Sequence, residues 1–343
     1  MSISPYIKEI GRGKDGARPL TREQATDLLG QVLDGQVTDL EVGAFCLAMR
    51  IKGETPDEMA GFIDAARARM ALIPPSPGRR PTVVLPSYNG ARKLPVLTPL
   101  LARLLVGQGL RVVIHGVTVD PGRTTTAQVL EALGQPVLAD VAEVRDDAVN
   151  FLPIEVLSPA LRRLLDVRRT VGLRNSAHSL VKLINPCVER ALVVGSYTHP
   201  EYRVSMAQTY AVLRADALLL RGIEGEAVAD ARRSQQIDAF IEGRRYRLQE
   251  AQTGPIASVP DWPRDIGAAS IADYIVQVLR GQQPLPLPIR QQVQQIQRAC
   301  DAIASGDAAG LGAVGDTLPP DEDPTVPAPP VTPPRAIAHE NTP

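Results

Sequence analysis

The chain has 343 residues, of which 44% are hydrophobic and 22% charged, and its net charge is −1. This composition is typical of a globular protein with a buried core. The apolar runs are too short for a membrane helix and the N-terminus lacks the apolar core of a secretory signal, so we expect a cytoplasmic protein with no membrane partner.

Cysteine and histidine show no pattern that would hold a metal. Cys46, Cys187 and Cys300 are odd in number and far apart, which indicates neither a disulfide framework nor a zinc site. The four histidines include no HExxH motif and no paired spacing. We therefore expect no cofactor and no metal, except under the transferase hypothesis described below.

The first seventy-odd residues carry three copies of one helix-start signal. In TREQ at Thr21, TDLE at Thr38 and TPDE at Thr55, a threonine is followed three residues later by glutamate or glutamine. In such a capping box the two side chains satisfy free amides at a helix N-terminus. Apolar residues at helical spacing follow, and Gly35 and Gly53 lie where the first two helices should end. The pattern predicts a compact helical unit.

Beyond this unit the pattern changes to short β-rich runs that alternate with helical stretches. The runs that should be strands covered on both faces are TVVL from Thr82, RVVIHG from Arg111, ALVVGS from Ala191 and DALLLRG from Asp216. The alternation predicts an α/β domain with a mostly parallel central sheet. Ligands of such sheets bind at the C-terminal ends of the strands, where PSYNGARK and HGVTVDPGR emerge.

The chain thus divides into three predicted parts. These are a small all-helical N-terminal domain over residues 1–75, a large α/β domain over 76–315, and a tail over 316–343. Helices near 158–188 could pack on the helical domain. The tail is rich in proline, acidic and poor in apolar side chains, so it cannot bury enough surface to offset its chain entropy and we expect it to be disordered. It would keep the protein soluble or, alternatively, recruit an interaction partner.

Several segments, in this order, resemble one family. LEVGAFCLAMRIKGETPDEMAGF, followed by VLEALG, VGLRNSAHSLVKLINP and RGIEG, is similar to the anthranilate phosphoribosyltransferases of glycosyltransferase family 3 and to related pyrimidine nucleoside phosphorylases. The resemblance implies a helical domain hinged to an α/β domain, and a homodimer formed through the helical domains. SYNGARK, RNSAH and THPEY resemble the YbiB-like branch, for which the resemblance implies nucleic-acid binding rather than synthesis of phosphoribosyl anthranilate.

The resemblance weakens at the positions that hold phosphoribosyl diphosphate. The family's GTGGDG loop is replaced by a segment with Tyr88, Asn89 and Gly90, and Thr98 is what remains of the Thr-x-Asn-x-Ser-Thr segment that follows it. Only His115-Gly116 is left of a Lys-His-Gly-Asn-Arg segment. The resemblance therefore implies that most of the phosphate-cradling pattern is lost.

The carboxylate pair that carries magnesium in the family is also changed. It should follow Gly225, where Glu226, Ala227 and Val228 stand instead. Glu224 and Glu226 are weak candidates for metal ligands, at a different spacing. Displacement of a diphosphate needs its charge neutralised by metal and cations, so these losses together remove that machinery. Mg²⁺ is expected only if the chain is still a transferase.

Cationic side chains gather in three segments. They are Arg162, Arg163, Arg168, Arg169, Arg174 and Lys182, with Asp166 as the only acid between them; Lys8, Arg12 and Lys14 in a basic N-terminal arm; and Arg92 and Lys93 beside Asn89-Gly90. Such clusters hold phosphates by counterion release. Because aromatic residues make up only 3% of the chain and no base-reading motif is present, this binding should be independent of sequence.

Each of these sets has a plainer interpretation. Arginine pairs on a helix are often a solvated face, and Asn-Gly is a common turn. His178 is more simply a packed or surface histidine than a catalytic base.

The resemblance implies that Arg174 keeps the position of the family's acceptor-site arginine. A vestigial substrate site would comprise Ser87, Tyr88, Thr98, His115, Gly116, Arg174 and His178.

Two functions therefore compete. The first, which we take as the prediction, is sequence-independent binding of nucleic acid, DNA or else RNA or single strands, by a homodimer that has no assigned catalytic residue. The alternative is a magnesium-dependent phosphoribosyl or pentosyl transferase with an unknown acceptor.

Overall fold

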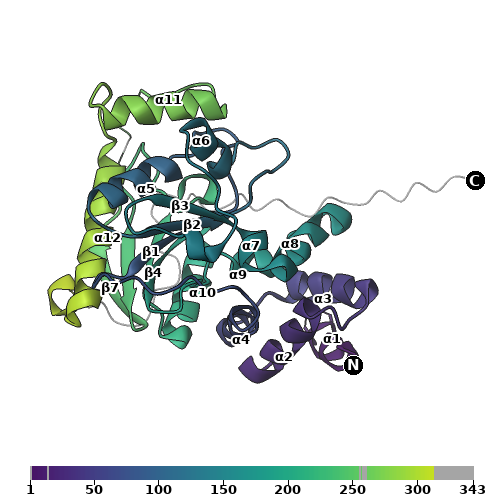
Figure 1. Ribbon diagram of the computed structural model, residues 1–343. Coiled ribbons are helices and arrows are strands. Elements are labelled where there is room, and N and C mark those ends of the chain that lie inside the picture. Colours follow the sequence, from purple (N-terminus) through teal and green to yellow (C-terminus); the bar gives the residue numbers. More distant parts are fainter. Residues whose placement is uncertain (1, 14, 255, 257–260, 313–343) are drawn as a thin grey trace, which may run out of the picture.

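The computed structural model describes residues 2–13, 15–254, 256 and 261–312, and the predicted tail lies outside them. Seven strands form one sheet in the order β3-β2-β1-β4-β5-β6-β7 (Figure 1). Five of them are parallel: β1 (Thr82–Ser87), β2 (Val112–Gly116), β3 (Val149–Pro153), β4 (Ala191–Tyr197) and β5 (Ala217–Arg221). At one edge, β6 (Ile237–Ile241) and β7 (Arg244–Gln249) add an antiparallel hairpin. The predicted mostly parallel sheet is confirmed.

Four helices precede the sheet: α1 (Ser4–Ile10), α2 (Arg22–Leu33), α3 (Asp39–Lys52) and α4 (Pro56–Arg67). All three predicted capping boxes are closed. At the starts of α2, α3 and α4, each threonine hydroxyl accepts from the backbone amide three residues on, and the threonine backbone amide donates to the side chain of that same residue. Glu58 of the third box also accepts from the amide of Leu20 at 2.8 Å and pairs with Lys52 at 2.6 Å. This buried carboxylate ties together the segments before α2, after α3 and at the start of α4.

The two faces of the sheet bury two separate cores. Val83 and Leu85 of β1 face one core and Val84 the other, as the strand's alternation requires. The first core is covered by α5 (Thr98–Gly107), α6 (Thr126–Ala132), α11 (Ala268–Leu279) and α12 (Leu287–Ser305). The second is continuous with the core of the helical domain, and α8 (Pro159–Val171), α9 (Ala177–Leu180) and α10 (Pro200–Leu213) take part in it (Figure 1). The helical domain is therefore packed against the helices that cover this face of the sheet, with α4 on α9 and α10 and α2 on α8.

The remaining short elements are α7 (Ile154–Leu157) and three 3-10 turns at Val141–Glu143, Ile223–Gly225 and Ala309–Leu311. α8 packs against α2, and α9 packs against α4. Within SAHSLVKLINP, only the four residues of α9 are helical. No helix in the described part of the chain is long and apolar enough to cross a membrane.

Candidate functional site

The C-terminal ends of the parallel strands bring distant loops into contact. Ser87 ends β1 beside Gly116, which ends β2, and a Cβ on Gly116 would collide with the Ser87 carbonyl. The loop after β1 crosses to the segment after β2, where Ala91 and Thr124 exchange backbone hydrogen bonds of 2.7 and 3.0 Å. Gly90 has a φ of 67°, and a Cβ there would lie 2.6 Å from the Thr124 carbonyl oxygen. Only glycine suits this crossing.

Glu226 fills the concave side of the β1 loop with its carboxylate. One oxygen accepts from the amides of Asn89 and Gly90, both at 2.8 Å. The other accepts from the hydroxyls of Ser87 and, at 3.3 Å, Thr98. The Glu226 side chain is 1% exposed. Consecutive amides that converge on one point form a nest for an anion, and in this protein the anion is a side chain of the same chain.

Glu224 does the same for the next part of the loop. Its carboxylate accepts from the amides of Arg92, Lys93 and Leu94 at 2.6, 2.7 and 3.1 Å. Its own backbone is in the left-handed region, with a φ of 49°. Together the two glutamates occupy five amides of the loop from Asn89 to Leu94. This loop therefore offers none of these five amides to an external phosphate in the described arrangement.

Two predicted cations approach the same loop from the other side. Arg174 donates to the side-chain oxygen of Asn89 at 3.3 Å, and the Lys182 ammonium donates to the carbonyl of Gly225 at 2.9 Å. Burial lowers the pKa of Lys182 to about 8; Glu226 opposes this shift, while Arg174 and Arg123 add to it. Burial also lowers the pKa of Arg174, with Arg168 and Arg123 acting in the same direction. The cations at this point repel one another, which would favour an added anion.

Buried His115 pairs with half-buried Tyr88 beside the loop. The tyrosine hydroxyl lies 2.7 Å from Nδ1 of His115, while Nε2 of His115 is buried without a partner among the described residues. Burial lowers the pKa of His115 to about 3, so the imidazole is neutral at physiological pH. A histidine held neutral and bonded to a tyrosine is a packed side chain and has no nucleophile to activate.

A cavity of about 290 Å³ lies between this edge and α8. Tyr88, His178, Arg168 and Arg169 line it, together with apolar residues such as Leu165. Burial lowers the pKa of His178 to about 4, and Arg174 and Arg168 contribute to the shift. The cavity therefore combines a neutral imidazole and an apolar wall with three arginines and two acids, Asp120 and Asp166.

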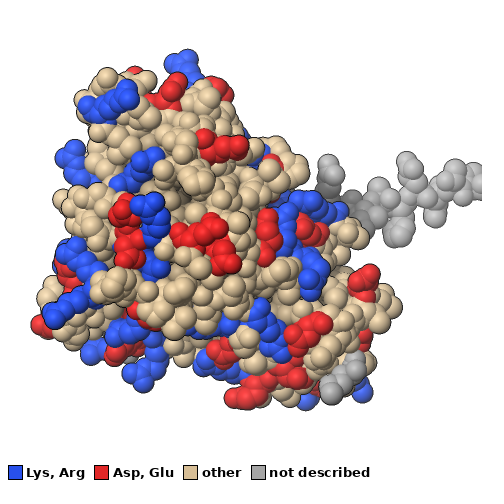
Figure 2. All heavy atoms as spheres, in the orientation of Figure 1, with Lys and Arg blue, Asp and Glu red and all other residues tan. Residues whose placement is uncertain are grey.

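The cations of α8 are less free than the sequence suggests, because acids from elsewhere reach them. Arg162 pairs with Asp166 at 2.8 Å and approaches Glu155 at 3.8 Å, and Asp166 also pairs with Arg169 at 3.3 Å. Arg168 lies 3.9 Å from Asp120. Figure 2 shows this mixture as blue side chains over α8 with red ones beside them. Asp166 is the only acid between Arg162 and Lys182 in the sequence, but the fold brings Glu155 and Asp120 to the same arginines.

The remaining predicted cations lie apart from the loop. Arg163 points toward the helical domain, where it donates to the Leu33 carbonyl at 3.4 Å. Lys8 and Arg12 belong to α1 and the turn after it, which Figure 1 places at the outer end of the helical domain. Lys14 lies outside the described residues. The structure thus brings together the loop residues, Arg174, Lys182, His178 and part of α8, but not the N-terminal arm.

One cation and one set of contacts were not anticipated. Arg123, in the loop after β2, donates to the Asn89 carbonyl at 3.2 Å. Its place in PGRTTT after a predicted strand could have identified it, because that loop reaches the same edge. The hydrogen bonds from the loop amides to Glu224 and Glu226 could not be predicted, because no pattern in the sequence near these glutamates indicates them.

A family model and several known proteins match this sequence. The model of the glycosyl transferase family helical bundle domain matches residues 4–70. The uncharacterized protein YbiB of Escherichia coli (strain K12) is 39% identical over 317 residues, which are 91% of this chain and 97% of YbiB. Anthranilate phosphoribosyltransferase of Dictyoglomus thermophilum is 24% identical over 273 residues, which are 74% of this chain and 79% of that enzyme. This chain belongs to the anthranilate phosphoribosyltransferase family.

Solved structures of family members share the fold. Anthranilate phosphoribosyltransferase from Thermus thermophilus matches with a TM-score of 0.69 at 23% identity, over 88% of this chain and 90% of that one. The Saccharomyces cerevisiae enzyme, in complex with PRPP and Mg, matches with a TM-score of 0.63 at 16% identity, over 89% of each chain. As a YbiB-like member of the anthranilate phosphoribosyltransferase family, this chain has the two-part architecture that its sequence predicts.

The magnesium of the family does not fit the residues present here. No group of three or more histidine, cysteine or acidic side chains that could hold a metal occurs among the residues the structure describes. Glu224 and Glu226 direct their carboxylates at backbone amides, and Ala227 and Val228 follow them.

Proposed function

We propose that the edge formed by the β1 loop and α8 binds the phosphate backbone of a nucleic acid without reading its sequence. The observation that carries the proposal is that Glu224 and Glu226 occupy the amides of the β1 loop, while cations remain around it. The carboxylates of Glu224 and Glu226 repel a diphosphate from the amides of the β1 loop. The cations around the loop can still hold the successive phosphates of a nucleic-acid backbone.

The charge at the rim supports this proposal. Eight cations lie on the loops and on the side of α8 that lines the 290 Å³ cavity, against four acids. The cations are Arg92, Lys93, Arg123, Arg162, Arg168, Arg169, Arg174 and Lys182, and the acids are Asp120, Asp166, Glu224 and Glu226. Arg92 and Lys93 are exposed and contact Glu224 through backbone amides, which leaves their charged groups free to reach phosphates. Polyanion binding by such a rim falls steeply as salt rises.

A phosphoribosyl or pentosyl transferase is the second candidate, and the relatives favour it. Several are named anthranilate phosphoribosyltransferase, and one solved relative binds PRPP and Mg. A transferase would need Glu224 and Glu226 to leave the loop amides so that a diphosphate could take their place. The acceptor would then lie in the cavity lined by Tyr88 and His178.

Fluorescence anisotropy of a labelled mixed-sequence oligonucleotide, titrated at several salt concentrations, tests the first candidate. We expect binding with a steep salt dependence, and similar affinities for unrelated sequences. Replacing Arg92, Lys93 and Arg174 by alanine should weaken binding and reduce the salt slope by about 0.7 to 0.9 for each lost phosphate contact.

The matched control removes two exposed cations from α12, which lies away from this edge, as Arg290→Ala with Arg298→Ala. It should leave both affinity and slope unchanged. Absence of binding at low salt, together with calorimetric binding of phosphoribosyl diphosphate in the presence of Mg²⁺, would overturn the nucleic-acid proposal in favour of the transferase.

A further inference from the structure

A second cavity, of about 450 Å³, lies at the C-terminal end of β5, next to the start of α10 and the segment before β6. The Gly222–Glu224 stretch lines it, and Glu224 also contacts the β1 loop described above. The cavity is rich in arginine. Its charged lining residues are Arg203, Arg221, Arg232, Arg233, Glu224 and Asp230.

The two acids that line this cavity among the described residues are already engaged. Asp230 pairs with Arg232 at 2.6 Å, and the same guanidinium lies over the ring of Trp262. Glu224 accepts from three backbone amides of the β1 loop. Neither carboxylate therefore neutralises Arg203, which is the most buried of the lining arginines.

Arg203 is a buried cation without a counter-ion in the described part of the chain. Its residue is 7% exposed, it donates to the side-chain oxygen of Gln236 at 3.3 Å, and its Nε is buried with no partner there. None of the ion pairs between described residues includes Arg203. A buried charge ordinarily has a carboxylate or a ligand beside it, since its desolvation is otherwise uncompensated.

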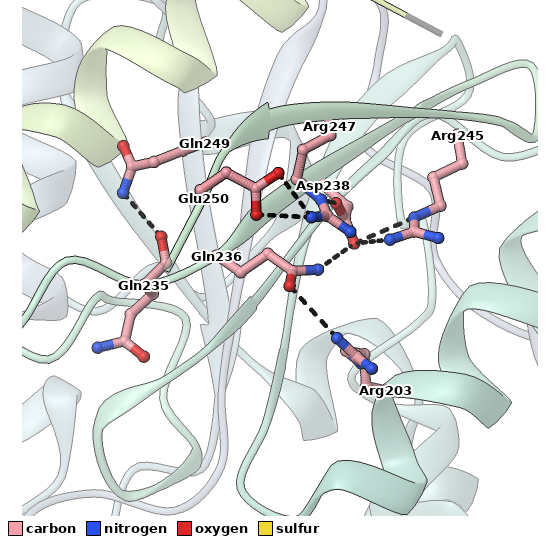
Figure 3. Close-up of polar contacts among 8 residues, drawn as sticks. All are labelled: Arg203, Gln235, Gln236, Asp238, Arg245, Arg247, Gln249 and Glu250. Carbon is pink, nitrogen blue, oxygen red and sulfur yellow. Dashed lines mark hydrogen bonds and ion pairs between the residues drawn. The ribbon is translucent and has the colours of Figure 1, made fainter. Parts of the chain in front are cut away.

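A buried network of hydrogen bonds and ion pairs holds the Arg203 guanidinium in place, as Figure 3 shows. Asp238 is paired with Arg245 at 3.0 Å and with Arg247, whose Nε lies 2.5 Å from it. Gln236 donates its amide nitrogen to Asp238 at 2.9 Å, so its oxygen must face Arg203. The network orients the guanidinium through a neutral amide and supplies no charge to neutralise it. Such an arrangement is preorganised for an external anion.

We propose that this cavity, which we name the Arg203 pocket, binds a small phosphate monoester. Several guanidinium groups match a dianion that can accept paired hydrogen bonds. Leu94, Ile223 and Ile256 provide an apolar wall for the carbon part, and Ser234 and Gln252 provide polar groups. The volume is that of a small-molecule site. The inference is independent of the function proposed for the β1 loop.

Isothermal titration calorimetry of the full chain with glycerol 3-phosphate tests the Arg203 pocket. We expect binding that glycerol does not reproduce, and Arg203→Met should weaken it at least about tenfold, because a charge-assisted hydrogen bond is lost. The free variant should unfold at the same or a higher temperature, since an uncompensated buried charge has been removed. If Arg203 only stabilised the fold, Arg203→Met would instead unfold at a lower temperature than the native chain.

Two further variants keep the test decisive. Gln236→Glu places a carboxylate beside Arg203 and should also abolish phosphate binding, whether or not Arg203→Met folds. Arg190→Met is the matched control: this arginine pairs with Asp216 at 2.7 Å, next to the start of β5 at the opposite end of the strand. It should lower stability and leave affinity for glycerol 3-phosphate unchanged.

The bound phosphate could belong to a small molecule or to the 5′ end of a nucleic acid. Oligonucleotides that carry or lack a 5′ phosphate distinguish the two. Equal affinities for the two, with glycerol 3-phosphate still bound by an Arg92→Ala, Lys93→Ala variant, would support a small-molecule ligand. A preference for the 5′ phosphate that Arg203→Met removes would overturn the assignment to a small molecule. No binding of glycerol 3-phosphate at millimolar concentration, or equal binding by native chain and Arg203→Met, would overturn the pocket itself.

Discussion

Glu226 accepts hydrogen bonds from two amides and two hydroxyls, and it is almost completely buried. Its charge is balanced by these donors and by the field of Lys182. Hydrogen bonds to an ionised acceptor are stronger than neutral ones. The β1 loop therefore owes its shape to a carboxylate that also excludes other anions.

Replacing Glu226 by alanine should have two separable effects. The unsatisfied amides and hydroxyls should lower the free energy of unfolding by about 3 kcal/mol. The emptied nest should then accept inorganic pyrophosphate, which would raise the unfolding temperature of Glu226→Ala but not that of the native chain. Differential scanning fluorimetry with and without pyrophosphate measures both effects.

Glu226→Gln is the control, because it removes the charge but keeps an acceptor and fills the space. It should be less destabilised than the alanine variant and should gain no response to pyrophosphate. Equal stabilisation of the native chain by pyrophosphate would contradict the account of an occupied nest.

His115 should make stability depend on pH. Its pKa is about 3 in the folded chain and near 6.5 when unfolded, so the unfolded state binds more protons between these values. Stability is therefore retained above pH 6.5 and is lost as the pH falls toward 3, with a slope of up to about 1.4 kcal/mol per pH unit. His178, whose pKa is about 4, adds to the same loss.

Urea unfolding of the native chain and of His115→Asn at pH 7 and pH 5 isolates this contribution. The loss of stability between the two pH values should be smaller in the variant. An NMR titration that found His115 protonated at pH 6 in the folded chain would refute the prediction.

Among the elements, those with local signals were predictable from the sequence. The capping boxes at Thr21, Thr38 and Thr55 set the starts of three helices because the signal lies within four residues. Unbroken apolar runs likewise predicted β1, β2, β4 and β5. The site is different, since Asn89 and Glu226 are 137 positions apart and their contact depends on the sheet order. The sequence could indicate the loop and its cations but not the carboxylates that occupy it.

The strands that were missed have polar or short sequences. In β6 and β7, charged residues such as Asp238, Arg245 and Arg247 pair with one another inside the hairpin, which conceals the apolar alternation. The turn between the strands is Glu242-Gly243, with φ values of 50° and 81°, a two-residue turn that glycine favours. β3 is only five residues long and includes Asn150, whose side chain bonds three carbonyls. These contacts are tertiary, so local propensity does not reveal them.

At the scale of the whole molecule, α3 presents an apolar stripe to the outside. Leu40, Leu47 and Ile51 are 84%, 45% and 62% exposed, while Phe45 and Met49 of the same helix are buried. Figure 1 places α3 at the outer end of the helical domain, away from α12. Exposed apolar side chains on one helix face are characteristic of an association surface. They are consistent with the homodimer through the helical domains that the sequence resemblance implies, which remains a prediction.

We expect the chain to be a dimer in light scattering at micromolar concentration, and Leu47→Glu with Ile51→Glu to make it a monomer. Two charges buried in an apolar contact should weaken association more than about a hundredfold, whereas both side chains are exposed in the free subunit and folding should be unaffected. Leu287→Glu, at a similarly exposed leucine that begins α12, is the control and should leave the dimer intact.

A native chain that is monomeric at every concentration would exclude the α3 dimer. Each binding edge would then act alone, because the dimer is what would double the cations available to one strand of nucleic acid and steepen the predicted salt dependence.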